Sequence, residues 1–67
     1  MSDLQPHQQR VVDERAELNA RIGKLDMFID SNPVFEKLSD KDQELLKAQR
    51  KAMQEYSGIL SQRILLF

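Results

Sequence analysis

The chain has no cysteine, one histidine, two glycines and two prolines among its 67 residues. Without cysteine it can form neither a disulfide nor a thiolate metal site. The single histidine, His7, cannot build a multi-histidine metal centre unless several copies of the chain share it. We therefore expect no metal and no cofactor, and the scarcity of glycine and proline favours a helical fold.

Long apolar runs and a dominant charge are also missing. No stretch approaches the roughly 20 apolar residues of a membrane span, and the first residues have no apolar signal-peptide core. Together with the lack of cysteine, this favours a cytoplasmic protein that does not enter a membrane. Ten basic and 11 acidic residues leave a formal net charge of −1, which gives no global field to hold DNA. An anionic ligand would have to be small and be met by local cations.

The motifs of common enzyme classes are absent as well. The sequence contains no G-x-S-x-G, no HExxH, no phosphate-cradling glycine loop and no cysteine nucleophile. Asp13 and Glu17 are four residues apart, but beside Arg10 and Arg21 they are typical of solvated ion pairs on a helix. We expect no enzymatic activity.

Apolar residues at helical spacing predict a first helix over residues 8–30. They recur at intervals of three, four and seven, at Val11, Leu18, Ile22, Leu25 and Ile29. Pro33 disfavours helix at Asn32, which ends this segment. Residues 31–39 are then expected to form a short turn element, with Asn32 as its cap and with Val34, Phe35 and Leu38 facing the hairpin.

Ser39 is the expected N-cap of a second helix over residues 40–66, because Asp40 and Asp42 follow it in the first turn. The prediction is an all-α, single-domain chain over residues 1–67. It is an antiparallel helical hairpin with a short turn helix at its bend.

The second helix carries two adjacent apolar rows. One consists of Leu45, Ala52, Tyr56 and Ile59, and the other of Leu46, Met53, Leu60, Ile64 and Phe67. One antiparallel partner helix can cover only one such stripe. A chain this short also has a small core, of roughly 3–5 kcal/mol. We therefore expect copies of the chain to assemble into a homo-oligomer through the surplus surface.

Several residues are candidates for binding a small anion. Arg63 lies inside the apolar terminal run, where it suits a ligand, an ion pair with Asp26 or Asp30 of another copy, or a snorkelling position. Tyr56 offers a stacking face and a hydroxyl, and also suits a core position. Lys24 lies near an apolar stripe, and His7 with Arg10 forms a basic edge. Repeated around a symmetric assembly, such cations can converge on a multi-phosphate ligand.

The ordered set of these patterns resembles a family of small phage proteins. The first helix matches it in Gln8-Gln9-Arg10-Val11-Val12-Asp13-Glu14, then Glu17-Leu18 and Arg21-Ile22-x-Lys24-Leu25-x-x-Phe28-Ile29. The later part matches in Phe35-x-x-Leu38, Leu45-Leu46-x-x-Gln49 and Met53-x-x-Tyr56-x-x-Ile59-Leu60-x-x-Arg63-Ile64. The family is the anti-CBASS cyclic-oligonucleotide sponges, which share a helical-hairpin domain with anti-Thoeris sponges. The resemblance covers roughly residues 8–65.

The resemblance implies a compact homohexamer that acts in the host cytoplasm. Such sponges bind cyclic dinucleotides such as cGAMP, and many also bind cyclic trinucleotides, in separate pockets between protomers. They do not cleave the ligand, and its depletion keeps the CBASS effector inactive.

The same resemblance implies which residues bind the ligands. For the dinucleotide pocket the matching positions are His7 or Gln9, with Arg10 nearby, and Lys24; His7 can stack on a base, whereas Gln9 cannot. For the trinucleotide pocket they are Arg63 and the backbone from Ile64 to Leu66, including Leu65. Asp26 is expected near that pocket, where its charge would disfavour phosphate.

A second interpretation comes from the residues alone. A small amphipathic hairpin is also a common coiled-coil-like interaction module, so the chain could be an adaptor that binds another protein and has no nucleotide ligand.

Overall fold

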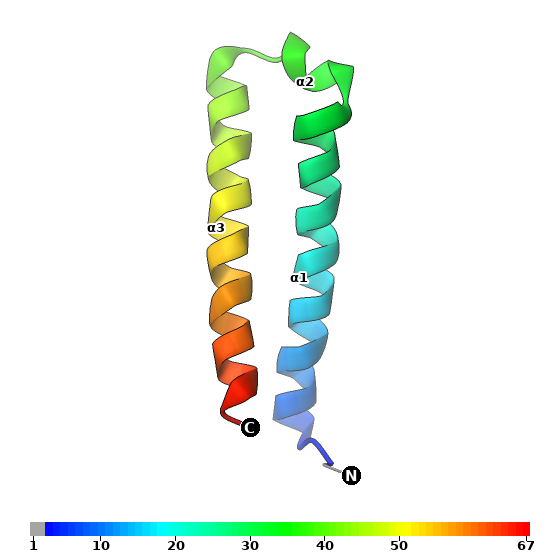
Figure 1. Cartoon of the computed structure of the whole chain (residues 1–67), viewed down its shortest axis with the longest axis vertical. Coiled ribbons are helices and arrows are strands. Elements are labelled where there is room, and N and C mark those ends of the chain that lie inside the picture. The colour runs from blue at the N-terminus through cyan, green and yellow to red at the C-terminus, as the bar shows by residue number, and fades with distance from the viewer. Residues whose placement is uncertain (1–2) are drawn as a thin grey trace.

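A computed structural model describes residues 3–67 of the chain, and this part contains three helices and no strand. The two long helices are α1 (Pro6–Ser31) and α3 (Asp40–Leu65), and the short helix α2 (Pro33–Lys37) lies between them. Figure 1 shows α1 and α3 side by side and antiparallel, with α2 at the bend and with the start of α1 and the end of α3 at the opposite end. The prediction of an all-α hairpin with a short helix at its bend is confirmed.

The helix ends differ from the predicted bounds by one to a few residues. Helix α1 begins at Pro6 instead of Gln8, because the fixed φ of proline suits the first helical position. The side chain of Gln8 also accepts a hydrogen bond from the backbone N–H of Gln5 at 2.9 Å. At the other end of the chain, α3 stops at Leu65 instead of residue 66.

Both predicted caps form. The Asn32 Oδ1 accepts a hydrogen bond from the backbone N–H of Val34 at 2.9 Å, and the Ser39 Oγ accepts one from Asp42 at 3.1 Å. Each cap satisfies a helix N–H that has no partner within its own helix. The chain therefore turns between the long helices through two capped helix starts.

The main core lies along the seam between α1 and α3. Leu60 is completely buried, and it packs with buried Val11 and Leu18. Ile22, Met53 and Ile64 lie half-buried around them. On α3, the row that begins at Leu46 is thus the one that faces α1.

A second cluster holds the bend. The buried Phe35 ring meets Phe28 edge to face, with 6.1 Å between ring centroids, and Lys47 Nζ lies 5.9 Å from the Phe35 centroid. The side chain of Gln43 donates to the carbonyls of Phe35 and Leu38, each at 3.1 Å. These bonds connect the end of α2 to the start of α3, and they satisfy backbone carbonyls that have no partner within the short helix.

One prediction for the bend is wrong. Val34 was expected to face the hairpin, yet it is 49% exposed. In a helix of five residues only one narrow face can turn inward, and here Phe35 occupies it.

The hairpin is slender, with extents of 49 × 16 × 14 Å. Each long helix therefore covers the other on one side only and exposes most of its circumference. Within residues 3–67, no helix combines the length and the apolar character that crossing a membrane requires.

Candidate functional site

The seam divides the hairpin into two sides of different character. We call the residues along the seam the inner row. It comprises Val11, Arg15, Leu18, Ile22, Leu25 and Ile29 on α1, and Leu46, Arg50, Met53, Ser57, Leu60 and Ile64 on α3. In an antiparallel pair of right-handed helices, residues one position before the inner row lie on one side of the pair. Residues one position after it lie on the other side.

The first of these sides, which we call the apolar side, carries the surplus row of α3. Leu45, Tyr56 and Ile59 on this row are 54%, 42% and 55% exposed. The interpretation of Tyr56 as a core residue is therefore wrong, because its neighbour Ser57 takes the inward position. An exposed row of apolar side chains at seam spacing is typical of a surface that another helix covers.

Four of the predicted cations and aromatic residues share this apolar side. Arg10 and Lys24 each precede an inner-row residue of α1, and Tyr56 and Arg63 do so on α3. His7 lies in the first turn of α1 and continues the same side, one residue before Gln8.

Lys24 and Arg63 are isolated cations within the described chain. Among residues 3–67 the ion pairs within 4.0 Å join Arg50 to Asp26 and to Asp30, and neither involves Lys24 or Arg63. Both cations are exposed, and no acid lies three or four residues away from either along its helix. They are therefore available to an anion that arrives from outside the chain.

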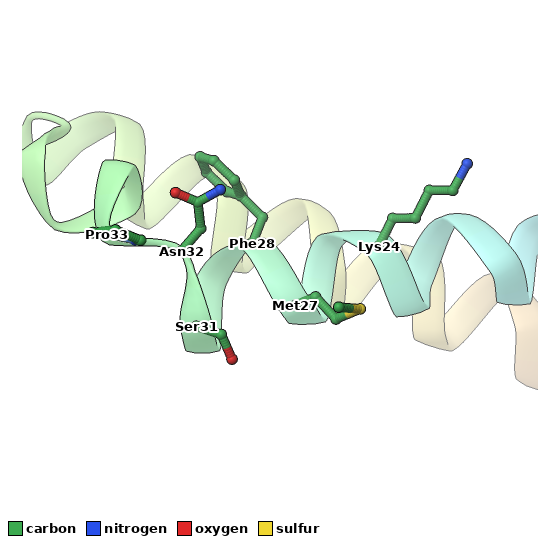
Figure 2. A pocket seen from close by; sticks show the side chains of 6 residues that line it. All are labelled: Lys24, Met27, Phe28, Ser31, Asn32 and Pro33. Carbon is green, nitrogen blue, oxygen red and sulfur yellow. The ribbon is translucent and has the colours of Figure 1, made fainter.

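Lys24 also borders an open groove of about 530 Å³ at the junction of α1 and α2. Figure 2 shows Lys24 and Phe28 projecting to the same side of α1, one helical turn apart. The groove is lined by Lys24, Met27, Phe28, Ser31, Asn32 and Pro33. One cation beside mostly apolar side chains suits a ligand with a flat base and a phosphate.

Two of the predicted site residues lie elsewhere. Gln9 follows Gln8, which lies three residues before Val11 and so continues the spacing of the inner row. Gln9 therefore faces the second side, where its side chain donates to Asp13 Oδ1 at 2.9 Å. Leu65 likewise follows Ile64 and is 83% exposed. The side chains of Gln9 and Leu65 thus face away from the side of Lys24 and Arg63, although the backbone of Leu65, which is the part implied for the trinucleotide pocket, lies two residues from Arg63.

The ion pair of Arg50 was not predicted. Its Nη1 lies 3.4 Å from Asp26 Oδ1 and 3.5 Å from Asp30 Oδ1. Asp26 therefore lies against Arg50, and Arg63 is 13 residues further along α3, which places it roughly 20 Å away along the helix. Asp26 can approach Arg63 only from another copy of the chain. A polar residue at inner-row spacing was the signal in the sequence that could have indicated this pair.

Two further polar contacts cross the seam. Arg15 Nη1 donates to Ser61 Oγ at 3.3 Å, and Ser57 Oγ donates to Asn19 Oδ1 at 2.5 Å. From Arg15 to Asn19 the chain advances four residues along α1, and from Ser61 to Ser57 it goes back four residues along α3. The two contacts therefore define the antiparallel register of the helices. Within residues 3–67 no group of three or more His, Asp or Glu side chains could hold a metal ion. The described surface offers cations, hydroxyls, amides and apolar faces for contact with a ligand.

Comparisons with known proteins place the chain in a family. No curated protein and no solved structure gives a significant match. The family model of Sequestin matches residues 5–66, which is nearly the whole chain. The name fits a protein that sequesters a ligand, as the resemblance to phage sponges implied, and this chain belongs to the Sequestin family.

Proposed function

We propose that the chain is a phage anti-defence sponge, which binds cyclic oligonucleotide second messengers in the host cytoplasm and does not cleave them. The observation that carries the proposal is the family match over residues 5–66. A protein that captures a signal in this way keeps the CBASS effector from being activated.

Assembly is the first physical requirement of this proposal. The exposed row of Leu45, Ala52, Tyr56 and Ile59 has the spacing of the seam, but within residues 3–67 no other helix covers it. Burying apolar area of this kind contributes about 25 cal/mol per Å². The seam of the hairpin is itself small, so association of copies would add stability that the single chain lacks.

Charge matching is the second requirement. A cyclic dinucleotide carries two phosphodiester charges and a cyclic trinucleotide carries three. A symmetric homo-oligomer, proposed here as a hexamer, presents one copy of each cation per protomer. Repetition of the isolated Lys24 or Arg63 can therefore match several phosphates, although the chain has a net charge of only −1.

Within this proposal the two cations serve different ligands. Lys24, beside the groove of α1 and α2, contacts cyclic dinucleotides, with His7 and Arg10 contributed near the start of α1. Arg63 and Tyr56 on the apolar side contact cyclic trinucleotides, with the backbone of Leu65 at the end of α3. Guanidinium and aromatic planes both stack on bases.

Thermal melting with a ligand panel tests the function. A ligand that binds only the folded assembly raises the melting midpoint, by an amount equivalent to about 2.7 kcal/mol at 100 times Kd. We expect at least one cyclic di- or trinucleotide to raise the midpoint, and linear dinucleotides of the same bases to have little effect. An unchanged midpoint across the whole panel would contradict the sponge and favour the adaptor that binds another protein.

Substitutions then test the assignment of residues. Lys24→Ala and Arg63→Ala should each weaken binding by roughly 10- to 100-fold, because each removes a charge-assisted contact. We expect them to affect different ligands in isothermal titration. Arg21→Ala is the matched control, since Arg21 is also an exposed cation of α1. Wild-type affinity for every ligand in both variants would show that the assignment is wrong.

A further inference from the structure

The second side of the hairpin, which we call the polar side, carries both glycines of the chain. Gly23 follows Ile22 on α1, and Gly58 follows Ser57 on α3. A glycine inside a helix costs about 1 kcal/mol relative to alanine. A Cβ added at either position would meet no atom within 4 Å, so contacts within the described chain do not require the glycines. They leave the backbone open to a group that approaches from outside.

Hydrogen-bonding side chains lie beside Gly58 on this side of the hairpin. We call Arg15, Asn19, Ser57 and Ser61 the Arg15 cluster. Arg15 and the two serines are half-buried in the seam, and the cluster is held by the bonds from Arg15 to Ser61 at 3.3 Å and from Ser57 to Asn19 at 2.5 Å. These bonds fix the positions of the side chains and leave much of their donor capacity unused.

The unused groups are mainly donors. A guanidinium has five N–H donors, and among residues 3–67 the one side-chain hydrogen bond of Arg15 goes to Ser61. No carboxylate of the described chain lies within 4.0 Å of Arg15. The carbonyl oxygen of Asn19 accepts from Ser57, so the amide N–H₂ of Asn19 remains free to donate.

Acids are absent from the rows around the cluster. Ala16 and Gly23 on α1 and Gln54 and Gly58 on α3 face the same side, and none carries a charge. Further along this side, the carboxylate of Asp26 is held by Arg50 at 3.4 Å. A half-buried guanidinium without a carboxylate, among amides and hydroxyls, is electrostatically suited to an oxyanion.

We propose that the Arg15 cluster binds a phosphodiester group of the sequestered ligand, an inference that rests on the proposed function. The fork of Arg15 meets the phosphate oxygens, Asn19 adds an N–H donor, and Gly58 leaves room for the ligand to reach the seam. Lys24 and Arg63 lie on the apolar side, so the cluster is a separate contact on each chain. Around the cluster, the neighbouring positions Ala16, Gln54 and Gly58 present no large apolar side chain, which makes this part of the polar side a poor seam for another copy.

Isothermal titration of the full chain with cGAMP and with a cyclic trinucleotide tests this site. Arg15→Gln removes the guanidinium. Gly58→Leu covers the cluster with a side chain, and because leucine is a better helix former than glycine, the substitution should not weaken α3. We expect each variant to weaken binding of at least one ligand by tenfold or more, with the mass of the assembly unchanged. Arg21→Gln, on the apolar side of the same helix, is the control and should stay within about twofold of wild type.

The outcomes separate this site from the function on which it rests. Wild-type affinity in both Arg15→Gln and Gly58→Leu, with a wild-type protein that binds, overturns the site and leaves the sponge intact. Failure of the wild-type chain to bind either ligand overturns both. Loss of binding together with loss of assembly in Gly58→Leu assigns the polar side to a contact between copies and also overturns the site. If Arg15→Gln loses its helical circular dichroism, Gly58→Leu decides alone.

Discussion

Polar residues inside the seam of a small hairpin have a cost and a use. Arg50 occupies an inner-row position where an apolar residue would bury more surface, and its side chain is 26% exposed. Its carboxylate partners, Asp26 and Asp30, are also partly exposed, so the pair contributes little to stability. It does specify how far α3 is shifted along α1, as single polar residues do in coiled-coil seams.

The burial of Leu60 leads to the first prediction at this scale. Leu60 has no exposed surface, so Leu60→Ala should lower the free energy of unfolding by about 2–5 kcal/mol. Urea denaturation followed by circular dichroism measures this change. Leu65→Ala is the matched control, because the same atoms are removed from an exposed side chain on the same helix. Similar losses in the two variants would contradict the burial that places Leu60 at the centre of the core.

The second prediction at the residue scale concerns Gly58. Gly58→Ala should raise the free energy of unfolding by about 1 kcal/mol, since the new Cβ would meet no atom within 4 Å. The same denaturation experiment applies. A fall in stability would mean that another chain packs closely against this backbone.

At the scale of elements, the caps explain why the chain bends where it does. Ser39 accepts a hydrogen bond from Asp42 at 3.1 Å and begins α3. Ser39→Ala should therefore lower stability by about 1 kcal/mol, while Ser39→Asp, which can still cap the helix, should preserve most of it. Thermal unfolding of the two variants measures the difference. Equal stability of Ser39→Ala and wild type would show that the cap is not needed for the bend.

The elements were predictable because their signals are local. Apolar spacing, the Asn32-Pro33 break and the Ser39 cap each act within a few residues, and they fixed both long helices closely. The short α2 was less predictable. Gln43 binds the carbonyls of Phe35 and Leu38 at 3.1 Å, and such contacts depend on tertiary packing that local patterns do not encode.

The candidate site shows the same limit. Sequence spacing alone shows that Lys24 and Arg63 are cations beside apolar stripes. To predict which side of the hairpin each cation faces, one must know which row of α3 is buried. The sequence of α3 has two adjacent apolar rows, and either could be the buried one. The contacts of Arg50 and Arg15 across the seam depend on the register of the two helices. Spacing within one helix carries no information on that register.

At the scale of the whole molecule, the surplus row of α3 (Leu45, Ala52, Tyr56 and Ile59) predicts assembly. Ile59 on this row is 55% exposed, so Ile59→Lys should place a charge in the contact between copies. We expect light scattering to show a shift from oligomer to monomer at micromolar concentration. Gln62→Lys is the control, because Gln62 lies outside both apolar rows of α3 and should leave the mass unchanged. An oligomer of wild-type mass in Ile59→Lys would place the contact on another surface.

Capture of intact ligand tests the central claim most directly. Purified protein is mixed with cGAMP or a cyclic trinucleotide, free ligand is removed by gel filtration, and the protein fraction is heated to unfold it. The sponge predicts that ligand elutes with the protein and that heating releases it chemically unchanged, in a fixed ratio to protomers. Absence of ligand from the protein fraction, or release of a cleaved product, would contradict the account.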